Sequence, residues 1–129
     1  TRYRSSAASD VYKRQALPLR AGYSVGMGWA NRAIAELGAG QHATIRPHGG
    51  SMRPKVMSGA RVVVEPVALT DLAVGDIVLC RVKGNVYLHL VKAIRGSGAN
   101  TSVQIGNNRG KINGWTRTVY GRAVEIDNP

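Results

Sequence analysis

The sequence contains no phenylalanine, one cysteine and few acidic residues, and each shortage excludes a class of structure. Without phenylalanine, the core of this chain must consist mainly of Val, Ile, Leu and Ala. Cys80 alone can form no internal disulfide and no cysteine metal site, and the apolar run 77–80 predicts that its thiol is buried. No apolar run reaches the roughly 18 to 20 residues that cross a bilayer. The sequence also shows no pattern for a metal or another cofactor, and we expect none.

The chain has 18 Lys and Arg residues and only 7 Asp and Glu residues, which gives a formal net charge of +11. Such a balance favours contact with polyanions such as nucleic acid or anionic lipid, and solubility alone is the alternative explanation. The cations form no single block, and Trp29 and Trp115 are far apart in the sequence. The pattern for a stacking platform that binds single strands is therefore weak.

Composition divides the chain into three segments. Residues 1–15 show no periodicity, and Ser5–Gln15 resembles translated sequencing-adapter read-through, so this segment is expected to be artefactual or a disordered basic tail. Residues 16–40 form an N-terminal helical segment, and residues 41–129 form a β domain. We expect the chain as given to be soluble, and cytoplasmic or peripheral to a membrane in a prokaryote. A lost upstream membrane anchor stays open, because the start is not natural-looking.

Residues 24–38 are predicted to be helical, capped by Ser24 and ended by Gly38. The predicted apolar face consists of Val25, Trp29, Ile34 and Leu37. From residue 42 onward the pattern is that of short strands, at 43–46, 61–65, 76–82, 86–95, 103–106 and 118–126. Lys83-Gly84-Asn85 predicts a hairpin turn between two of these strands. The sequence therefore predicts a mainly β, compact and partly closed fold with one short N-terminal helix.

The segment from Gly49 to Pro54 carries the first candidate for chemistry, Ser51. It is a glycine-rich turn between two predicted strands, and glycines let the backbone adopt unusual angles and let a substrate chain come close. A serine held there can present its hydroxyl and offer its own backbone N–H to an oxyanion. The alternative is an ordinary turn serine.

Serine needs a base, and His89 is the candidate, because the serine hydroxyl is almost never ionised at neutral pH. His89 lies in the predicted strand 86–95, where alternation places it on one face with Tyr87 and Val91. Lys92 falls on the opposite face and is expected to be solvated. A histidine among apolar neighbours in a strand is also commonly structural, so both roles stay open on this evidence.

Ser51 and His89 belong to a larger set of motifs that follow one another at a specific spacing. They are Gly50-Ser51-Met52-x-Pro54, Gly59-Ala60, Val74-Gly75-Asp76-Ile77-Val78, His89-Leu90-Val91-Lys92, Ile105-Gly106-Asn107-Asn108 and Val119–Val124. Over about residues 44–126 they resemble the superfamily of signal peptidase I and LexA-like serine peptidases. The resemblance implies a mostly β fold, Ser51 as nucleophile and a Lys or His general base. It also implies an oxyanion hole formed by the N–H of Ser51 and a neighbour from the Gly49 and Gly50 side. His89 stands at the base position, so the chain is similar to the Ser–His branch, which includes archaeal and endoplasmic-reticulum signal peptidases.

The chain departs from this family pattern at Asn107, where the family often has aspartate. An aspartate there can orient the histidine, whereas Asn107 can hydrogen-bond an imidazole but cannot stabilise the imidazolium by charge. An inactive homologue therefore stays open. Asp76 is a second candidate for an orienting residue, although its position after Val74-Gly75 favours a turn-capping role.

Three functions remain open on the sequence. The first is an endopeptidase that binds another polypeptide as an extended strand with small residues near the scissile bond. The second is a self-cleaving regulator of the LexA or UmuD kind, for which Ala21-Gly22 and Ala39-Gly40 are the candidate bonds. The third is a catalytically weak, basic nucleic-acid-binding domain, with phosphate contacts from Arg53, Lys55, Arg61, Arg109, Lys111 and Arg122.

Overall fold

The computed structural model describes residues 2–4 and 28–129, and these form one antiparallel sheet with a single α-helix. The strands are β1 (Arg2–Arg4), β2 (Ala43–Ile45), β3 (Arg61–Glu65), β4 (Ile77–Val82), β5 (Asn85–Arg95), β6 (Ser102–Gly106), β7 (Ile112–Thr116) and β8 (Val119–Asp127). The order across the sheet is β2-β3-β8-β4-β5-β6-β7, with β1 paired to β8 beside this path. The mainly β fold with one short helix is thus confirmed, and the sheet is not closed, because its path begins at β2 and ends at β7.

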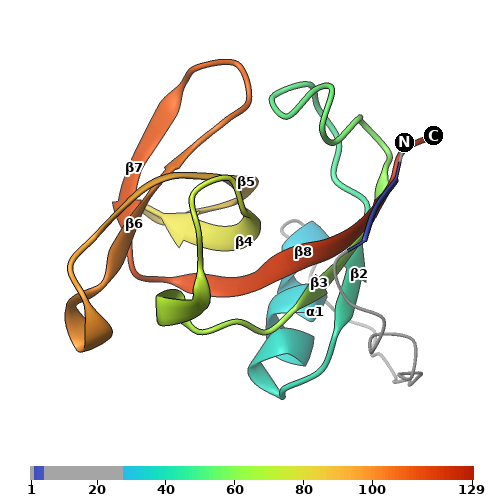
Figure 1. Cartoon of the computed structure of the whole chain (residues 1–129). Coiled ribbons are helices and arrows are strands. Elements are labelled where there is room, and N and C mark those ends of the chain that lie inside the picture. The colour runs from blue at the N-terminus through green and yellow to red at the C-terminus, as the bar shows by residue number, and fades with distance from the viewer. Residues whose placement is uncertain (1, 5–27) are drawn as a thin grey trace.

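Helix α1 (Gly28–Gly38) packs beside β2 and β8, at the end of the sheet opposite the β6–β7 hairpin (Figure 1). Its buried face consists of Ala30, Ala33 and Leu37, which recur at helical spacing. Trp29 was expected on this face, but its side chain is 48% exposed. At about 100° per residue, Leu37 falls between Ala33 and Ala30 around the helix, and position 29 lies about 80° from Leu37, at the margin of this face. The predicted residues Ser24 and Val25 lie outside the described part of the chain.

The core divides into two clusters, because strand residues alternate between the two faces of the curved sheet. Leu79 of β4 lies in the cluster beneath α1, whereas its neighbours Val78 and Cys80 lie in the cluster inside the β4–β7 curl. Cys80 is fully buried, as expected, and this burial raises the pKa of its thiol to about 12. The cysteine therefore acts as a small apolar core residue.

The β4–β5 hairpin sets the register of the strand that carries His89. Val82 pairs with Asn85, and the intervening Lys83 and Gly84 have φ angles of 52° and 86°. Two positive φ angles match the twist of the flanking strands, so the turn predicted here forms. This register places His89 opposite Val78.

Two strands form where the sequence pattern predicts none. Strand β7 contains Asn113-Gly114, a dipeptide typical of turns, yet it pairs along β6 with Gly114 opposite Ile105. Strand β1, which lies within the segment expected to be a tail, pairs with Glu125–Asp127 of β8. The remainder of that segment, residues 5–15, lies outside the described part of the chain.

Candidate functional site

Ser51 lies on the irregular segment between β2 and β3, and buried apolar side chains of this segment anchor it in the core. Met52 and Val56 are 4% and 3% exposed and belong to the core cluster beneath α1. The N–H of Val56 donates to the carbonyl of Met52 at 3.0 Å. Gly49 has a φ of +115°, a conformation that favours glycine, and its N–H donates to Ser58 Oγ at 3.1 Å. The sequence therefore folds this segment so that Ser51 projects from a fixed turn.

A second loop, between β6 and β7, is hydrogen-bonded to the turn that carries Ser51. The N–H of Asn108 donates to the carbonyl of Ser51 at 2.9 Å, and its Nδ2 donates to the carbonyl of Arg53 at 2.8 Å. Asn107 shapes this loop, because its Oδ1 accepts from the N–H groups of Arg109 and Lys111 at 2.8 and 2.9 Å. Asn107 is therefore a loop residue, with its carboxamide oxygen turned to its own backbone.

His89 meets Ser51 across the space between these segments. Its ring is 8% exposed and stacks on Tyr87, with ring centroids 4.9 Å apart. The Ser51 Oγ lies 3.0 Å from His89 Nε2, and His89 Nδ1 lies 2.7 Å from Asn113 Oδ1. The structure thus brings together the serine and histidine that the sequence singles out, and it adds Asn113 from β7.

The Asn113 contact defines which ring nitrogen of His89 carries the proton. A carboxamide oxygen only accepts hydrogen bonds, so His89 Nδ1 donates to Asn113 Oδ1 and Nε2 is left with a free lone pair. The Ser51 hydroxyl then donates to Nε2. A serine whose proton points at an unprotonated imidazole nitrogen is poised for nucleophilic attack, with Asn113 orienting the base.

The surroundings of His89 favour its neutral form. Burial lowers its pKa from 6.5, the hydrogen bond to Asn113 opposes this, and the positive charge of Lys111 lowers the pKa further. The net direction is downward, so the imidazole is neutral at pH 7. A neutral imidazole is the form that accepts a serine proton.

Asp76 lies outside this constellation. Its Oδ2 accepts from the N–H of Ala73 at 2.8 Å and lies 3.6 Å from Nη1 of Arg122. The N–H of Val91 also donates to the backbone carbonyl of Asp76 at 2.9 Å. These contacts give Asp76 the turn-capping role, and within the described residues it makes no hydrogen bond to His89.

Ser51 and His89 open onto a groove of about 500 Å³. Its apolar wall includes Met52, Val56 and Leu88, and Trp29 lies at its rim. Among the described residues, the charged ones that line it are Arg46 and Lys111, and none is an Asp or Glu. The groove therefore combines an apolar surface with positive charge at the candidate dyad.

The backbone N–H of Ser51 is a free donor at the turn, since no hydrogen bond within the described residues uses it. The same holds for the N–H of Gly50, whereas that of Gly49 is taken up by Ser58. The N–H groups of Ser51 and Gly50 are therefore available to an oxyanion beside Ser51, whereas that of Gly49 is not.

Asn113 is the site residue that the sequence reasoning missed. Its only local signal, the Asn113-Gly114 dipeptide, points to a turn, and its approach to His89 depends on the β6–β7 pairing. Among the described residues, no three His, Cys, Asp or Glu side chains gather as a metal site, and no helix is long and apolar enough to span a membrane. No protein-family model matches the chain, and no curated protein matches it.

Proposed function

We propose that the chain is a serine endopeptidase of the Ser–His type, resembling the signal-peptidase superfamily. The observation that carries this proposal is the relay from Ser51 Oγ to His89 Nε2 at 3.0 Å and from His89 Nδ1 to Asn113 Oδ1 at 2.7 Å. A buried neutral histidine needs a partner for each ring nitrogen, and a purely structural role would be met by any two partners. Here the second nitrogen meets a serine at the mouth of a groove.

In the proposed reaction, Ser51 Oγ attacks the carbonyl carbon of the scissile bond while its proton passes to His89 Nε2. The carbonyl oxygen becomes an oxyanion beside the N–H groups of Ser51 and Gly50. When the C–N bond breaks, the imidazolium returns the proton to the leaving amine. Water then hydrolyses the serine ester by the same proton transfers in the second half of the reaction.

Asn113 supports the proposed mechanism by orienting His89, but it also limits the expected rate. It keeps the imidazole in the productive tautomer, as an orienting acid would. Because it is neutral, it cannot stabilise the imidazolium by charge, so we expect slow turnover. The substrate is a polypeptide that lies extended in the groove, with small residues flanking the scissile bond as the resemblance implies.

Cleavage of a second polypeptide fits the described residues better than cleavage of the chain itself at Ala39-Gly40. The N–H of Gly40 donates to the carbonyl of Leu37 at 3.0 Å, which ties this peptide into the end of α1. A bond held in that turn is not extended, as a peptidase substrate must be. The other candidate bond, Ala21-Gly22, lies outside the described residues.

The test uses the full chain, because β1 contributes to the sheet. Wild type and the variants Ser51→Ala, His89→Ala and Ser97→Ala are incubated with a fluorogenic peptide bearing an Ala-x-Ala motif, and with a fluorophosphonate, which phosphonylates activated serines with loss of fluoride. We expect peptide cleavage in wild type and in Ser97→Ala, but not in the other two variants. In the same two proteins, mass spectrometry is expected to find the fluorophosphonate label on Ser51. Cleavage that survives Ser51→Ala, or labelling elsewhere, would overturn the assignment.

A further inference from the structure

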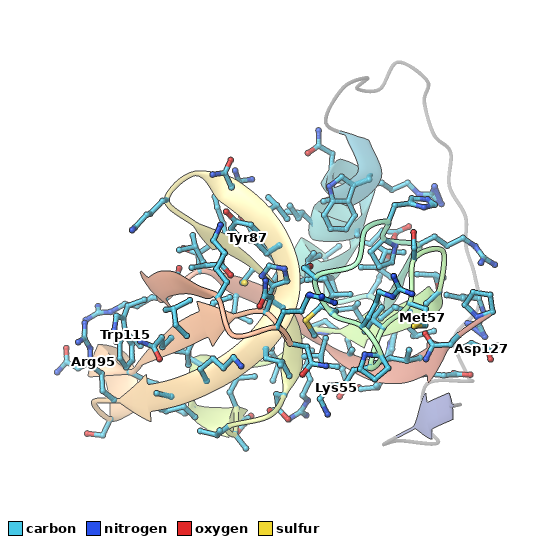
Figure 2. The ribbon with its side chains drawn as sticks, turned by 90° about the horizontal axis from the view of Figure 1, so that it is seen from above. Lys55, Met57, Tyr87, Arg95, Trp115 and Asp127 are labelled. Atoms are coloured by element: carbon cyan, nitrogen blue, oxygen red, sulfur yellow. The ribbon has the colours of Figure 1, made fainter. Side chains whose placement is uncertain are left out.

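A second cavity lies away from the Ser51 groove, at the far end of the curled sheet. It is formed by the end of β5, the start of β6 and the end of β7. Figure 2 shows two of its residues, Arg95 and Trp115, side by side at the end of the molecule opposite Met57 and Asp127. The cavity has a volume of about 630 Å³ and is open to solvent. That volume lies within the range of small-molecule sites.

Arg95 is held in place at this cavity by two contacts. Its Nε donates to Ser102 Oγ at 3.2 Å, and its guanidinium carbon lies 4.0 Å from the centroid of the Trp115 ring. The guanidinium therefore lies over the face of the indole, which is a cation–π arrangement. Both terminal NH₂ groups of Arg95 remain available, because none of its hydrogen bonds or ion pairs within the described residues uses them.

No carboxylate in the described part of the chain pairs with the cations at this cavity. Arg117 also lines it, and neither Arg95 nor Arg117 makes an ion pair with a carboxylate in the described part of the chain. Asn100 and Thr116 add polar groups to the lining. Two unpaired guanidinium groups beside an aromatic surface are complementary to an anion attached to a flat ring.

The wall next to Arg95 is built on a backbone contact that only glycine permits. Gly96 has a φ of +80°, and a Cβ there would lie 2.1 Å from the carbonyl oxygen of Asn100. The loop therefore folds tightly back on itself, which fixes Asn100 beside Arg95. The cavity thus has a defined shape, and it is not an accidental gap between mobile side chains.

We propose that this cavity binds a nucleotide unit, with its phosphate on Arg95 and Arg117 and its base stacked on the Arg95–Trp115 pair. Guanidinium groups bind phosphate through paired N–H donors, and bases stack on aromatic rings and on guanidinium planes. Asn100 supplies a carboxamide that can donate to and accept from a base edge. The site is independent of the proposed peptidase chemistry and uses none of its residues.

A nucleotide unit has two sources, a free nucleotide and a single-stranded nucleic acid. The formal net charge of +11 favours the polymer, because cations outside the cavity add contacts to neighbouring phosphates. An acidic peptide shares the negative charge but has no base to stack on Trp115. These three ligands are therefore the arms of the test.

The experiment measures binding to the full chain at fixed low salt. The ligands are AMP, inorganic phosphate, a fluorescein-labelled single-stranded oligonucleotide and a hexaglutamate peptide. The variants are Arg95→Gln, Arg95→Lys, Trp115→Leu and Arg32→Gln, the last of which removes the same charge on the exposed side of α1, at the end of the sheet opposite the β6–β7 hairpin (Figure 1). Thermal unfolding of each variant shows whether it is folded.

We expect the oligonucleotide to bind, AMP to bind more weakly and to compete with it, and hexaglutamate to compete poorly. Arg95→Gln weakens oligonucleotide binding by about tenfold or more, since stacking and phosphate contact are lost together, whereas Arg32→Gln changes it by less than about twofold. Arg95→Lys keeps the charge but loses the planar guanidinium with its paired donors, and it still weakens binding. Equal losses for Arg95→Gln and Arg32→Gln, or hexaglutamate competing as well as AMP, would overturn the proposal. Absence of binding by both AMP and the oligonucleotide would overturn it equally.

Discussion

His89 Nδ1 donates to Asn113 Oδ1 across 2.7 Å, and this bond joins the centre of β5 to β7, a strand two positions away in the sheet. Between them lies β6, whose glycine Gly106 pairs with both Leu90 and Ile112. A Cβ at Gly106 would lie 2.6 Å from the carbonyl oxygen of Lys111. The absence of a side chain at that position lets the loop after β6 close over the sheet, and this brings Asn113 to the histidine.

The pH dependence of activity follows from the lowered pKa of His89. The neutral imidazole is the base, so kcat/KM rises with pH through a folded-state pKa below 6.5 and reaches its plateau by about pH 7. The same shift affects folding: the unfolded chain binds the proton more tightly, so its contribution to stability is present above pH 6.5 and is lost as the pH falls. A ¹H NMR titration of the His89 ring, assigned with His89→Ala, measures the pKa directly. A value above 6.5 would contradict this prediction.

Replacing the neutral orienting group by a charged one tests the role of Asn113. In Asn113→Asp, a carboxylate beside Nδ1 stabilises the imidazolium, so the pKa of His89 rises and the acid limb of the pH profile moves to higher pH. Turnover on the plateau increases, because the same charge stabilises the imidazolium formed during attack. In Asn113→Ala, kcat/KM falls by about tenfold, the equivalent of one lost hydrogen bond.

The matched control for this change is Asn107→Asp. A carboxylate at position 107 still accepts from the N–H groups of Arg109 and Lys111, so the loop keeps its shape. We expect a clearly smaller displacement of the pH profile than for Asn113→Asp. If Asn107→Asp moved the profile more, Asn107 would be the orienting residue after all.

The sequence predicts much of this site because the pattern of β5 and the Ser51 turn are local. Alternation places His89 with Tyr87 and Val91, and the hairpin at Lys83-Gly84 sets its register against β4. Glycines mark the turn that presents Ser51. These features depend on neighbouring residues, so composition and spacing reveal them.

The remainder of the site depends on pairing between distant segments, which a sequence pattern does not encode. Asn113 was missed because Asn-Gly is typical of turns, whereas it lies within β7 at the point where the ladder with β6 shifts register. Asn107 was weighed as the orienting residue because the resembled family often has aspartate there, but the tight turn directs its carboxamide to its own backbone. Trp29 was assigned to the core on helical spacing alone, yet it lies at the rim of the groove.

Removing the charge of Lys111 tests the electrostatics of the groove. Lys111 lines the groove and lowers the pKa of His89, so Lys111→Gln raises that pKa. Peptides with Asp or Glu beside the small residues are expected to be cleaved faster than the same peptides with Lys, and this preference weakens in Lys111→Gln and at high salt. The measurement compares kcat/KM for the paired peptides, with Lys55→Gln as the control for net charge. An unchanged preference in Lys111→Gln would show that the groove does not select by charge through this residue.

Gly121 supports the junction between β8, β3 and helix α1, and a methyl group there is expected to disrupt it. A Cβ at Gly121 would lie 2.5 Å from the carbonyl oxygen of Glu65 and 2.7 Å from Val64 Cγ1. Backbone cannot move aside without breaking the β3–β8 ladder, so Gly121→Ala lowers the free energy of unfolding by about 3 kcal/mol.

The control for Gly121→Ala is Gly38→Ala, at the last residue of α1. A Cβ at Gly38 would meet nothing within 4 Å. Because alanine is the better helix former, this variant is expected to be unchanged or more stable by up to about 1 kcal/mol. Urea unfolding followed by circular dichroism measures both variants against wild type. Equal stability of Gly121→Ala and wild type would show that β8 and β3 do not approach as closely as the contact at Glu65 requires.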